Sequence, residues 1–486
     1  MFGGLTKTSS RIAIAAALGL TLGGYAMSTP AKAADLGGDC CADLEERVAE
    51  LEATTVRKGN KKVSVTLSGW VIKSMNWWDD GGTSSFAVAD KSYDLGSRFA
   101  ITGSATIAPG WSAGYNLTVN TMADQFGTAG TGAASNQFSE FGGTYGNIST
   151  LYSYMYIKSD KYGTLNWGHL SPASDNPAVL ADISGSVIES NAVWFEGGSF
   201  FMRPSGGGGA LNAITWGSFV QCSGLAPTGA GIGADCFGAA QPAVRYDTPT
   251  FGGFRLETSY GTNELTAPAF GASTAASNFW DIAAFYNGDW GNFKVSAAYA
   301  YTWQETAMAT FINPTVATSG SDLHQVGATV MHSPSGLGIY GLYQHEEAGA
   351  LPDGDVWYLK PFIKRNWNPA GATVLYGEYG QYNDQYASLA GISQCGTVGN
   401  VAGTAAGNFC GNNVANTLFV TGSEIERWGL GAVQEIDSAA MHLFARWQHQ
   451  DASIDFVGTN VNGVKSSVSQ GFEDWDLFQV GGIIFF

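Results

Sequence analysis

The stretch that most resembles a catalytic motif is GWSAG at 110–114, which matches the G-x-S-x-G pattern of a hydrolase nucleophile. That pattern needs a strand that enters a helix, whereas Ser112 follows the turn sequence APG and opens a stretch of alternating polar and apolar residues. The six histidines show no HExxH or other close metal-ligand spacing. The run PSGGGGA lacks the Gly-Lys-Ser/Thr ending of a phosphate loop. We therefore predict no enzyme activity, no catalytic residue, no metal and no cofactor.

The composition instead favours strands joined by many turns. Charged residues make up only 13% of the 486 residues, aromatic residues reach 13%, and there are 66 glycines. A soluble helical enzyme usually carries about twice that share of charge. The composition is also unlike that of a disordered chain, so we expect an all-β protein.

The first residues are typical of a secretory signal peptide. Lys7 and Arg11 precede the apolar stretch IAIAAALGLTL, and AKAAD offers a cleavage site after Ala33, so we predict a signal peptide over 1–33. Its removal leaves 20 basic and 41 acidic residues, a net charge of −21. Nucleic acid is an unsuitable partner because its binding depends on Lys and Arg contacts to phosphate.

A short helix is expected before the strands begin. In 34–62, Leu44, Val48 and Leu51 are spaced four and three apart with charges between them, which builds an a/d seam. Two heptads are too few to be stable alone. The segment is therefore either a linker helix or a small periplasmic coiled coil beneath an oligomer.

The six cysteines suit an exported, oxidising setting. Cys222 and Cys236 lie 14 residues apart, Cys395 and Cys410 lie 15 apart, and each pair sits in a Gly/Ala/Thr-rich stretch. Each pair is a candidate disulfide within its own loop. Cys40 and Cys41 are neighbours, which favours either a bond between chains or reduced thiols.

Alternating segments recur along the chain, which indicates half-buried strands. In WSAGYNLTVN, for example, Trp111, Tyr115 and Leu117 share one face, and Asn116 and Thr118 share the other. FKVSAAYAYTWQ and MHLFARWQ alternate in the same way. A soluble sandwich would bury the apolar face against a second sheet, whereas an outer-membrane barrel turns it to lipid.

Aromatic residues and connection lengths favour the barrel. Tryptophans recur towards strand ends, as in the interfacial girdles of membrane barrels; they are Trp77, Trp78, Trp111, Trp290, Trp303, Trp367 and Trp447. No run after the signal is long enough for a membrane helix, and only helices and closed barrels satisfy the backbone in lipid.

Short turns alternate with longer stretches along the chain, and this alternation predicts the number of strands. The short turns are APGW, SDKYGT, TPTFGG, NGDWGN, SPSG, NPAG and EIDSA. The longer stretches are 78–96, 121–149, 171–240, 263–277, 305–321, 346–355, 384–424 and 452–473. Seven turns join fourteen strands, and the first and last strands make sixteen over 63–486. If ALNAITWGSFV in 171–240 is also a strand, the count becomes eighteen.

Taken together, these features resemble the outer-membrane porins of Gram-negative bacteria, and most closely those of alphaproteobacteria. The local match is YSYMYIKSDKYGTLNWGHLSP, with a tight turn at Tyr162, Gly163 and Thr164 and a strand that ends in Gly168 and His169, where Gly-Arg is common. RYDTPTFGGFRLETSYG resembles the strand, turn and strand that follow the third loop of such porins. The replacement of Arg by His169 and the length of 171–240 depart from the family pattern.

The resemblance implies a homotrimer of sixteen-stranded barrels in the outer membrane that passes ions and small hydrophilic solutes by passive diffusion. It also implies an infolded third loop that narrows each lumen, with acids on the loop set against bases on the wall. The loop candidates are Asp175, Asp182, Glu189 and Glu196, and the wall candidates are Arg98, Arg255, Lys360, Lys364, Arg427 and Arg446. Arg98, Arg427 and Arg446 are the preferred wall residues. Because a charge facing lipid at mid-membrane costs about 2–4 kcal/mol, all of them are expected to point inward.

The expected partners follow from the same resemblance: outer-membrane lipid and lipopolysaccharide, small solutes, and the barrel assembly machinery, whose signal would be the terminal Phe486. The acidic net charge favours a weak preference for cations. Two other functions stay open: an outer-membrane barrel hydrolase, and a structural barrel whose acidic loops bind divalent cations and anchor lipid or a surface layer.

Overall fold

A computed structural model describes residues 62–91, 95–121, 148–193, 196–198, 200–205, 215–220, 240–262, 278–310, 313–348, 353–385, 418–459 and 465–486. The predicted signal peptide, the N-terminal helix and all six cysteines lie outside these ranges. These predictions therefore remain predictions.

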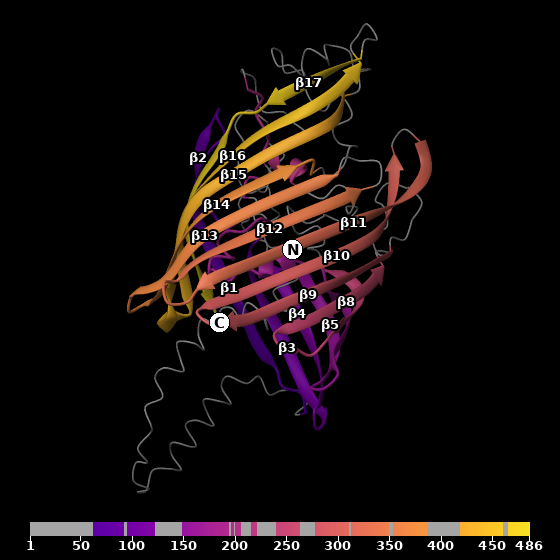
Figure 1. The fold of residues 1–486 in the computed structure, drawn as a ribbon, viewed down its shortest axis with the longest axis vertical. Helices are drawn as coiled ribbons and strands as arrows, with labels where there is room; N and C mark the ends of the chain where they lie inside the picture. Colours follow the sequence, from indigo (N-terminus) through magenta and orange to yellow (C-terminus); the bar gives the residue numbers. More distant parts are fainter. Residues whose placement is uncertain are drawn as a thin grey trace.

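Sixteen antiparallel strands form a closed barrel, and two further short strands, β2 and β17, extend its edge (Figure 1). The strands are β1 (Thr66–Asp79), β2 (Ser84–Ala89), β3 (Ser97–Ala108), β4 (Trp111–Thr121), β5 (Ile148–Ser159), β6 (Gly163–Leu170), β7 (Gln241–Asp247), β8 (Phe254–Thr262), β9 (Asn278–Trp290), β10 (Phe293–Thr310), β11 (Asn313–His332), β12 (Leu337–Ala348), β13 (Gly354–Asn368), β14 (Gly371–Asn383), β15 (Leu418–Ile436), β16 (Met441–Thr459), β17 (Lys465–Gly471) and β18 (Trp475–Phe485). The predicted barrel of sixteen strands is thereby confirmed.

The barrel closes where the last strand meets the first. β18 pairs with β1 in a register that sets Trp70 opposite Phe485, and β1 continues the ring by pairing with β3. The amide of Gly69 donates to the carbonyl of Phe486 at 2.8 Å, and the amide of Phe486 donates back at 3.1 Å. The final residue is therefore part of the seam that removes the sheet's free edges.

All seven predicted short turns join consecutive strands at one end of the barrel. The turn between β5 and β6 shows why its glycine is needed: Gly163 has φ = 91°, and a Cβ there would lie 2.2 Å from the carbonyl oxygen of Asp247. Two predictions about the longer connections were wrong. Most of 305–321 belongs to the extended hairpin of β10 and β11, and 84–89 and 465–471 form β2 and β17 within stretches expected to be loops.

Successive side chains along the strands alternate between the outer and the inner face of the barrel, as the sequence predicted. On β4, Leu117 on the outer face is 37% exposed, whereas Asn116 on the inner face is 4% exposed. On β18, Phe478 and Ile484 point outward, and Leu477, Gln479 and Ile483 are buried inside. Trp78 departs from the prediction: it is not part of an outer girdle but faces inward, with its ring 4.8 Å from that of Phe200.

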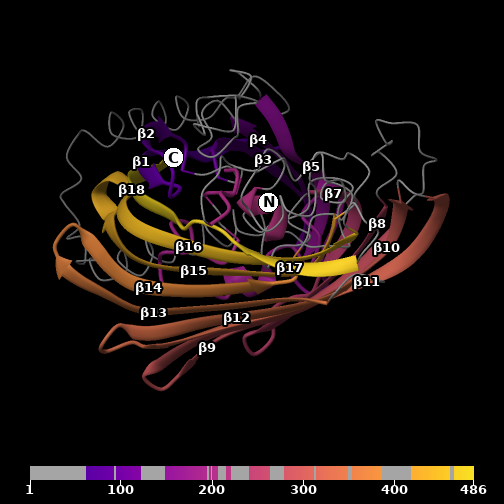
Figure 2. The ribbon, with the colours of Figure 1, turned by 90° about the horizontal axis from the view of Figure 1, so that it is seen from above.

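The interior holds the chain that follows β6, so the core lies inside the ring of strands (Figure 2). This chain contains α4 (Pro177–Leu180) and the 3₁₀ helix η1 (Trp216–Phe219); a second 3₁₀ helix, η3 (Asp437–Ala439), lies in the turn before β16. The described part of ALNAITWGSFV, residues 215–220, contains η1 and no strand, and the two strands beyond sixteen are β2 and β17. Among the residues that the structure describes, no helix has the length and apolar character needed to cross a membrane.

Candidate functional site

The site is built by residues 171–205, here called the infolded segment, which enter the barrel after β6 and follow its inner wall. Bonds to the wall begin at β7 and β8, where Arg245 donates to the carbonyl of Ser171 at 2.6 Å and Ser259 accepts from the amide of Ala173 at 3.0 Å. They end near β18, where the ring of Phe200 lies 5.5 Å from that of Trp475. The segment thus runs around the barrel wall.

Lumen-facing side chains of successive strands bind the segment's backbone. They supply hydrogen-bond donors to carbonyl oxygens of the segment inside the barrel, where backbone polar groups need partners. The donors are Gln325 on β11 to Ser174 (2.7 Å), Thr329 on β11 to Ala181 (2.7 Å), Tyr340 on β12 to Ala178 (2.9 Å), Lys360 on β13 to Ser190 (2.6 Å), Tyr382 on β14 to Ala192 (2.5 Å) and Arg427 on β15 to Asn191 (2.6 Å).

Two predicted loop acids, Asp182 and Glu196, form ion pairs with the wall, and a third, Glu189, contacts a wall histidine. Asp182 lies 2.6 Å from the ammonium of Lys360, with both side chains fully buried. Glu189 lies 3.1 Å from Nδ1 of His442 on β16. Glu196 pairs with Arg446 on β16. Loop and wall charges are therefore in direct contact on one side of the lumen.

Glu196 is the most heavily paired of these acids. Its Oε1 lies 2.5 Å from the ammonium of Lys91, and its other oxygen meets Arg446. Burial alone would raise the pKa of Glu196, but two neighbouring cations hold that pKa below its usual value. Lys91 has one acid partner and a nearby arginine, and burial lowers its pKa to about 8.

The remaining predicted residues lie at different places around the segment. Asp175 accepts a hydrogen bond from Ser171 at 2.5 Å, and Arg98 on β3 is buried with its guanidinium 4.8 Å from the ring of Trp70. Arg427 lies 3.8 Å from Glu378 on β14. Lys364 pairs with Glu435 at 2.7 Å towards the short-turn end.

Sequence reasoning missed several residues that hold the segment. Lys91 and Arg203 lie in long connections, where period-two phase gives no information; Arg203 pairs with Asp80 at 2.8 Å. Glu378 binds Ser190 and accepts from Tyr358 at 2.6 Å. Its inward phase in LYGEYGQY on β14 is a signal that could have found it.

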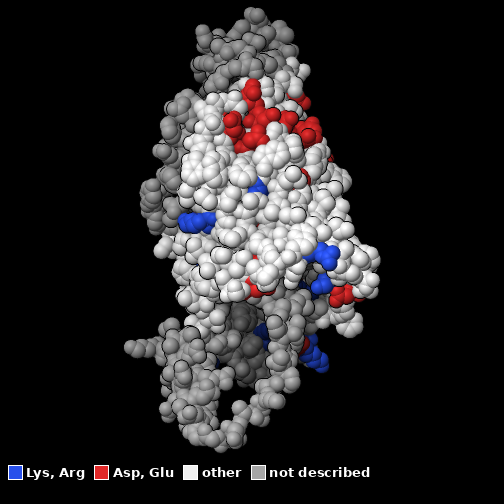
Figure 3. Space-filling model, turned by 90° about the vertical axis from the view of Figure 1, so that its left-hand side faces the viewer, with Lys and Arg blue, Asp and Glu red and all other residues white. Residues whose placement is uncertain are grey.

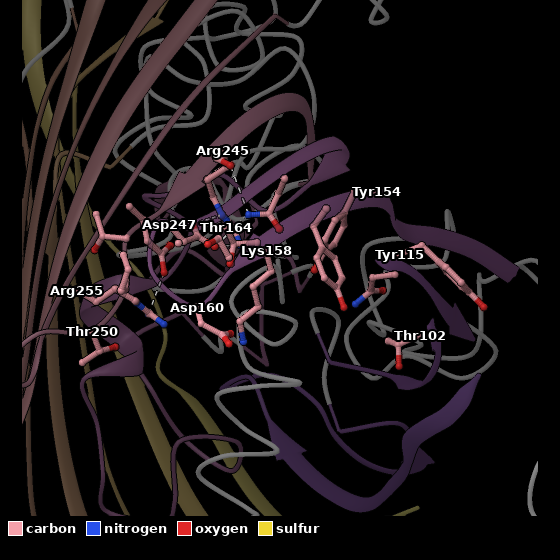
Figure 4. A pocket seen from close by; sticks show the side chains of 18 of the residues that line it. Thr102, Tyr115, Tyr154, Lys158, Asp160, Thr164, Arg245, Asp247, Thr250 and Arg255 are labelled. Carbon is pink, nitrogen blue, oxygen red and sulfur yellow. Dashed lines mark hydrogen bonds and ion pairs between the residues drawn. The ribbon is translucent and has the colours of Figure 1, made fainter. Parts of the chain in front are cut away.

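The opposite side of the lumen is open. A cavity of about 830 Å³ lies at the short-turn end, against β1 and β3–β8. Its lining is mostly polar and includes Tyr154, Tyr156, Lys158, Asn166, Arg245 and Arg255 (Figure 4). Arg255, one of the predicted wall residues, pairs with Glu257 at 2.9 Å and stacks on Phe285 at 4.8 Å.

On the face shown in Figure 3, charged residues are sparse across the middle, and acids gather towards the end with the long connections. Exposed acids at that end include Glu424, Asp451 and Asp474. Exposed rings below them include Trp428 at 43% and Trp357 at 52%. An apolar band bordered by aromatic rings fits a bilayer of finite thickness.

The other chemical signals from the sequence have no supporting geometry. Ser112 lies on β4 directly after the turn from β3, which is not the strand-to-helix elbow of a hydrolase. Within the described ranges, no group of three or more His, Cys, Asp or Glu residues could hold a metal ion.

Comparison with known proteins agrees with this architecture. The family model described as Gram-negative porin matches residues 15–473. The chain belongs to the Gram-negative porin family. The porin therefore forms a channel for passive diffusion in the outer membrane of a Gram-negative bacterium, and its short turns lie on the periplasmic side.

Several solved structures are similar to this chain at low sequence identity, and the first of them shares its fold. An anion-selective porin from Comamonas acidovorans is 16% identical, with a TM-score of 0.52, over 87% of this porin and 100% of that chain. OprB of Pseudomonas putida is 10% identical, with a TM-score of 0.48, over 91% and 97%. OmpT of Vibrio cholerae is 12% identical, with a TM-score of 0.48, over 88% and 100%. No curated protein matched, and the alphaproteobacterial subtype remains a prediction.

Proposed function

We propose that ions and small hydrophilic solutes cross this porin through the open half of its lumen, bounded by β1 and β3–β8. The observation that carries this proposal is the placement of the infolded segment. It is bound to the inner side of β7–β9 and β11–β16 by buried polar contacts and packs against β18, whereas the polar cavity of about 830 Å³ lies at the short-turn end against β1 and β3–β8. A water-filled path needs a polar wall, and the open half supplies one.

The predicted site residues then have two roles. Asp182, Glu189 and Glu196 with Lys360, His442 and Arg446 hold the infolded segment against the wall and so set the width of the constriction. Asp175, Arg98, Lys364 and Arg427 support the same segment from its ends and sides. Arg255 borders the water path itself.

The porin acts without covalent chemistry or a cofactor in this proposal. Its pairs of opposite charge leave little net charge on the inner wall, and the excess of acids lies at the extracellular mouth. That mouth concentrates cations weakly, since screening limits its reach to about 8 Å. We therefore propose a weak cation preference, which reversal potentials under a salt gradient would test.

Family membership also supports a homotrimer that contacts outer-membrane lipid and lipopolysaccharide. The terminal Phe486, seated in the seam between β18 and β1, would be read by the barrel assembly machinery. Chemical cross-linking of the porin in native membranes would test the trimer.

Single-channel conductance in a planar bilayer tests the proposed path. Thr102 on β3 lines the cavity, so Thr102→Trp should lower the conductance by filling part of the open half. Ile101 is its neighbour on the outer face, opposite exposed Leu117, so Ile101→Trp is a matched control that should leave the conductance unchanged. Equal conductance in both variants would place the path elsewhere, and wild-type protein without ion current would overturn the proposed channel.

A further inference from the structure

Two arginines that line the cavity on the open half are each paired with an acid. Arg245 is held by both carboxylate oxygens of Asp247, at 2.7 and 3.0 Å, and Arg255 is held by Glu257. Each of these pairs joins a base to an acid two positions further along the same strand. Each pair has no net charge, and its two side chains contact each other within the barrel wall.

Lys158 and Asp160 are not engaged in this way. Both line the cavity and are exposed, and neither has an ion pair or side-chain hydrogen bond within the part of the chain that the structure describes. Lys158 is the penultimate residue of β5, and Asp160 begins the turn to β6, where its amide donates to the carbonyl of Gly110 at 3.0 Å. Figure 4 shows both side chains reaching into the cavity from the same strand end.

The strand that carries Lys158 also presents two phenol rings. Tyr154 and Tyr156 precede Lys158 at alternate positions of β5, so all three face the lumen in a row. Consecutive members of such a row are about 7 Å apart, because a strand rises about 3.3 Å per residue. A solute in the cavity would meet two hydroxyl groups, then one ammonium group, then one carboxylate.

This arrangement selects by the distribution of charge in a solute. A purely anionic solute is attracted by Lys158 but repelled by Asp160. A purely cationic solute is attracted by Asp160 but repelled by Lys158. A solute with a carboxylate at one end and an ammonium at the other meets both groups favourably.

We infer that the Lys158–Asp160 end of this cavity is a binding subsite for small zwitterionic solutes such as amino acids and short peptides. The inference rests on the proposed path through the open half. Lys158 binds the solute's carboxylate and Asp160 binds its ammonium, and Tyr156 and Tyr154 follow Lys158 in the same lumen-facing row. The subsite lies at the periplasmic mouth, away from the constriction.

The experiment measures how strongly added solutes reduce the KCl current through the full-length porin in a planar bilayer. The probes are triglycine, glycine, succinate, putrescine and sucrose. The zwitterions triglycine and glycine should halve the current at lower concentrations than succinate, putrescine or sucrose. Lys158→Gln and Asp160→Asn should each raise the triglycine concentration needed about three- to fivefold, the usual worth of an exposed ion pair.

Two further variants separate a binding role from a structural one. Lys161→Gln removes a charge from the same turn, but the Lys161 ammonium lies 5.2 Å over the Tyr162 ring and outside the cavity lining, so triglycine should block this variant as it blocks wild type. Lys158→Arg keeps the charge and should keep the block, which maintains the test if Lys158→Gln fails to assemble.

Three results would overturn the subsite. They are a conducting wild type that triglycine blocks no better than sucrose, a stronger block by succinate or putrescine than by triglycine, and equal effects of Lys158→Gln and Lys161→Gln. A wild type without any KCl current would contradict the proposed function itself, so the two failures can be told apart.

Discussion

The two halves of the inner wall differ in how many of their charged side chains remain in contact with water. On the closed half, formed by β9–β16 and β18, charged side chains are buried in contact with the infolded segment, as in the pair of Lys360 and Asp182. On the open half, Lys158 and Asp160 stay in water. A barrel interior can therefore serve as a protein core on one side and as a solvated channel wall on the other.

The difference lies in what surrounds each charge. A buried charge has lost its water, so its partner is needed, and removal of one member of a buried pair costs about 3–5 kcal/mol. An exposed charge keeps its hydration, and its contacts are worth about 1 kcal/mol or less. Substitutions on the closed half should thus change stability and segment position, whereas those on the open half should change solute interaction.

The largest effect is expected from Arg446→Ala. This change leaves Glu196 buried with Lys91 as its remaining cation and removes the bond from Arg446 to Gln479 at 3.0 Å. We expect a loss of about 3–5 kcal/mol in the free energy of unfolding, measured by urea titration of the folded porin. Arg446→Lys retains the charge and should lose less; equal losses would show that the charge itself is unimportant.

A substitution at the close backbone contact between α4 and β11 should give the next largest effect. The segment's α4 lies so close to β11 that a Cβ at Gly327 would stand 2.1 Å from the carbonyl oxygen of Ala178. Gly327→Ala should displace the segment and cost about 1–3 kcal/mol. At Gly341 on β12 the nearest atom is 3.8 Å away, so Gly341→Ala is a matched control. Higher protease sensitivity of the segment in Gly327→Ala alone would verify this contact.

Low pH should release part of the infolded segment from the closed half of the wall. Because the pKa of Glu196 is lowered in the folded state, its contribution to stability is complete above the usual titration range of Glu, near pH 4.3, and is lost as the pH falls through the lowered pKa. We expect the segment to become more accessible to an acid-active protease such as pepsin below about pH 4. Glu196→Gln should show a weaker pH dependence, and an unchanged profile in this variant would assign the transition to other groups.

The smallest effect should come from the open half. Arg255→Gln removes the base of a neutral pair and leaves Glu257 beside the water path, so the reversal potential should shift towards stronger cation preference. Glu257→Gln should shift it in the opposite direction. Shifts of the same sign in both variants would contradict the assignment of this pair to the lumen.

Much of the barrel could be predicted from the chain because the relevant signals are local. Alternation placed Leu117 outside and Asn116 inside, and Pro, Gly, Asn and Asp marked all seven short turns. The same rule failed for Trp78, since an aromatic residue near a strand end suits a girdle as well as it suits the interior core around Phe200. Composition alone does not distinguish these two environments.

The sequence by itself determined the ring of strands, its closure at the C-terminal residues and the inward phase of residues such as Arg427 and Arg446, because each depends on neighbours within a few positions. Only the tertiary structure decided which charged side chains form ion pairs with one another. Glu196 meets Arg446 from 250 residues away in the chain and Lys91 from 105, and no local pattern encodes such contacts. The path of the infolded segment, and hence the division into a closed and an open half, arises from the sum of these distant pairings.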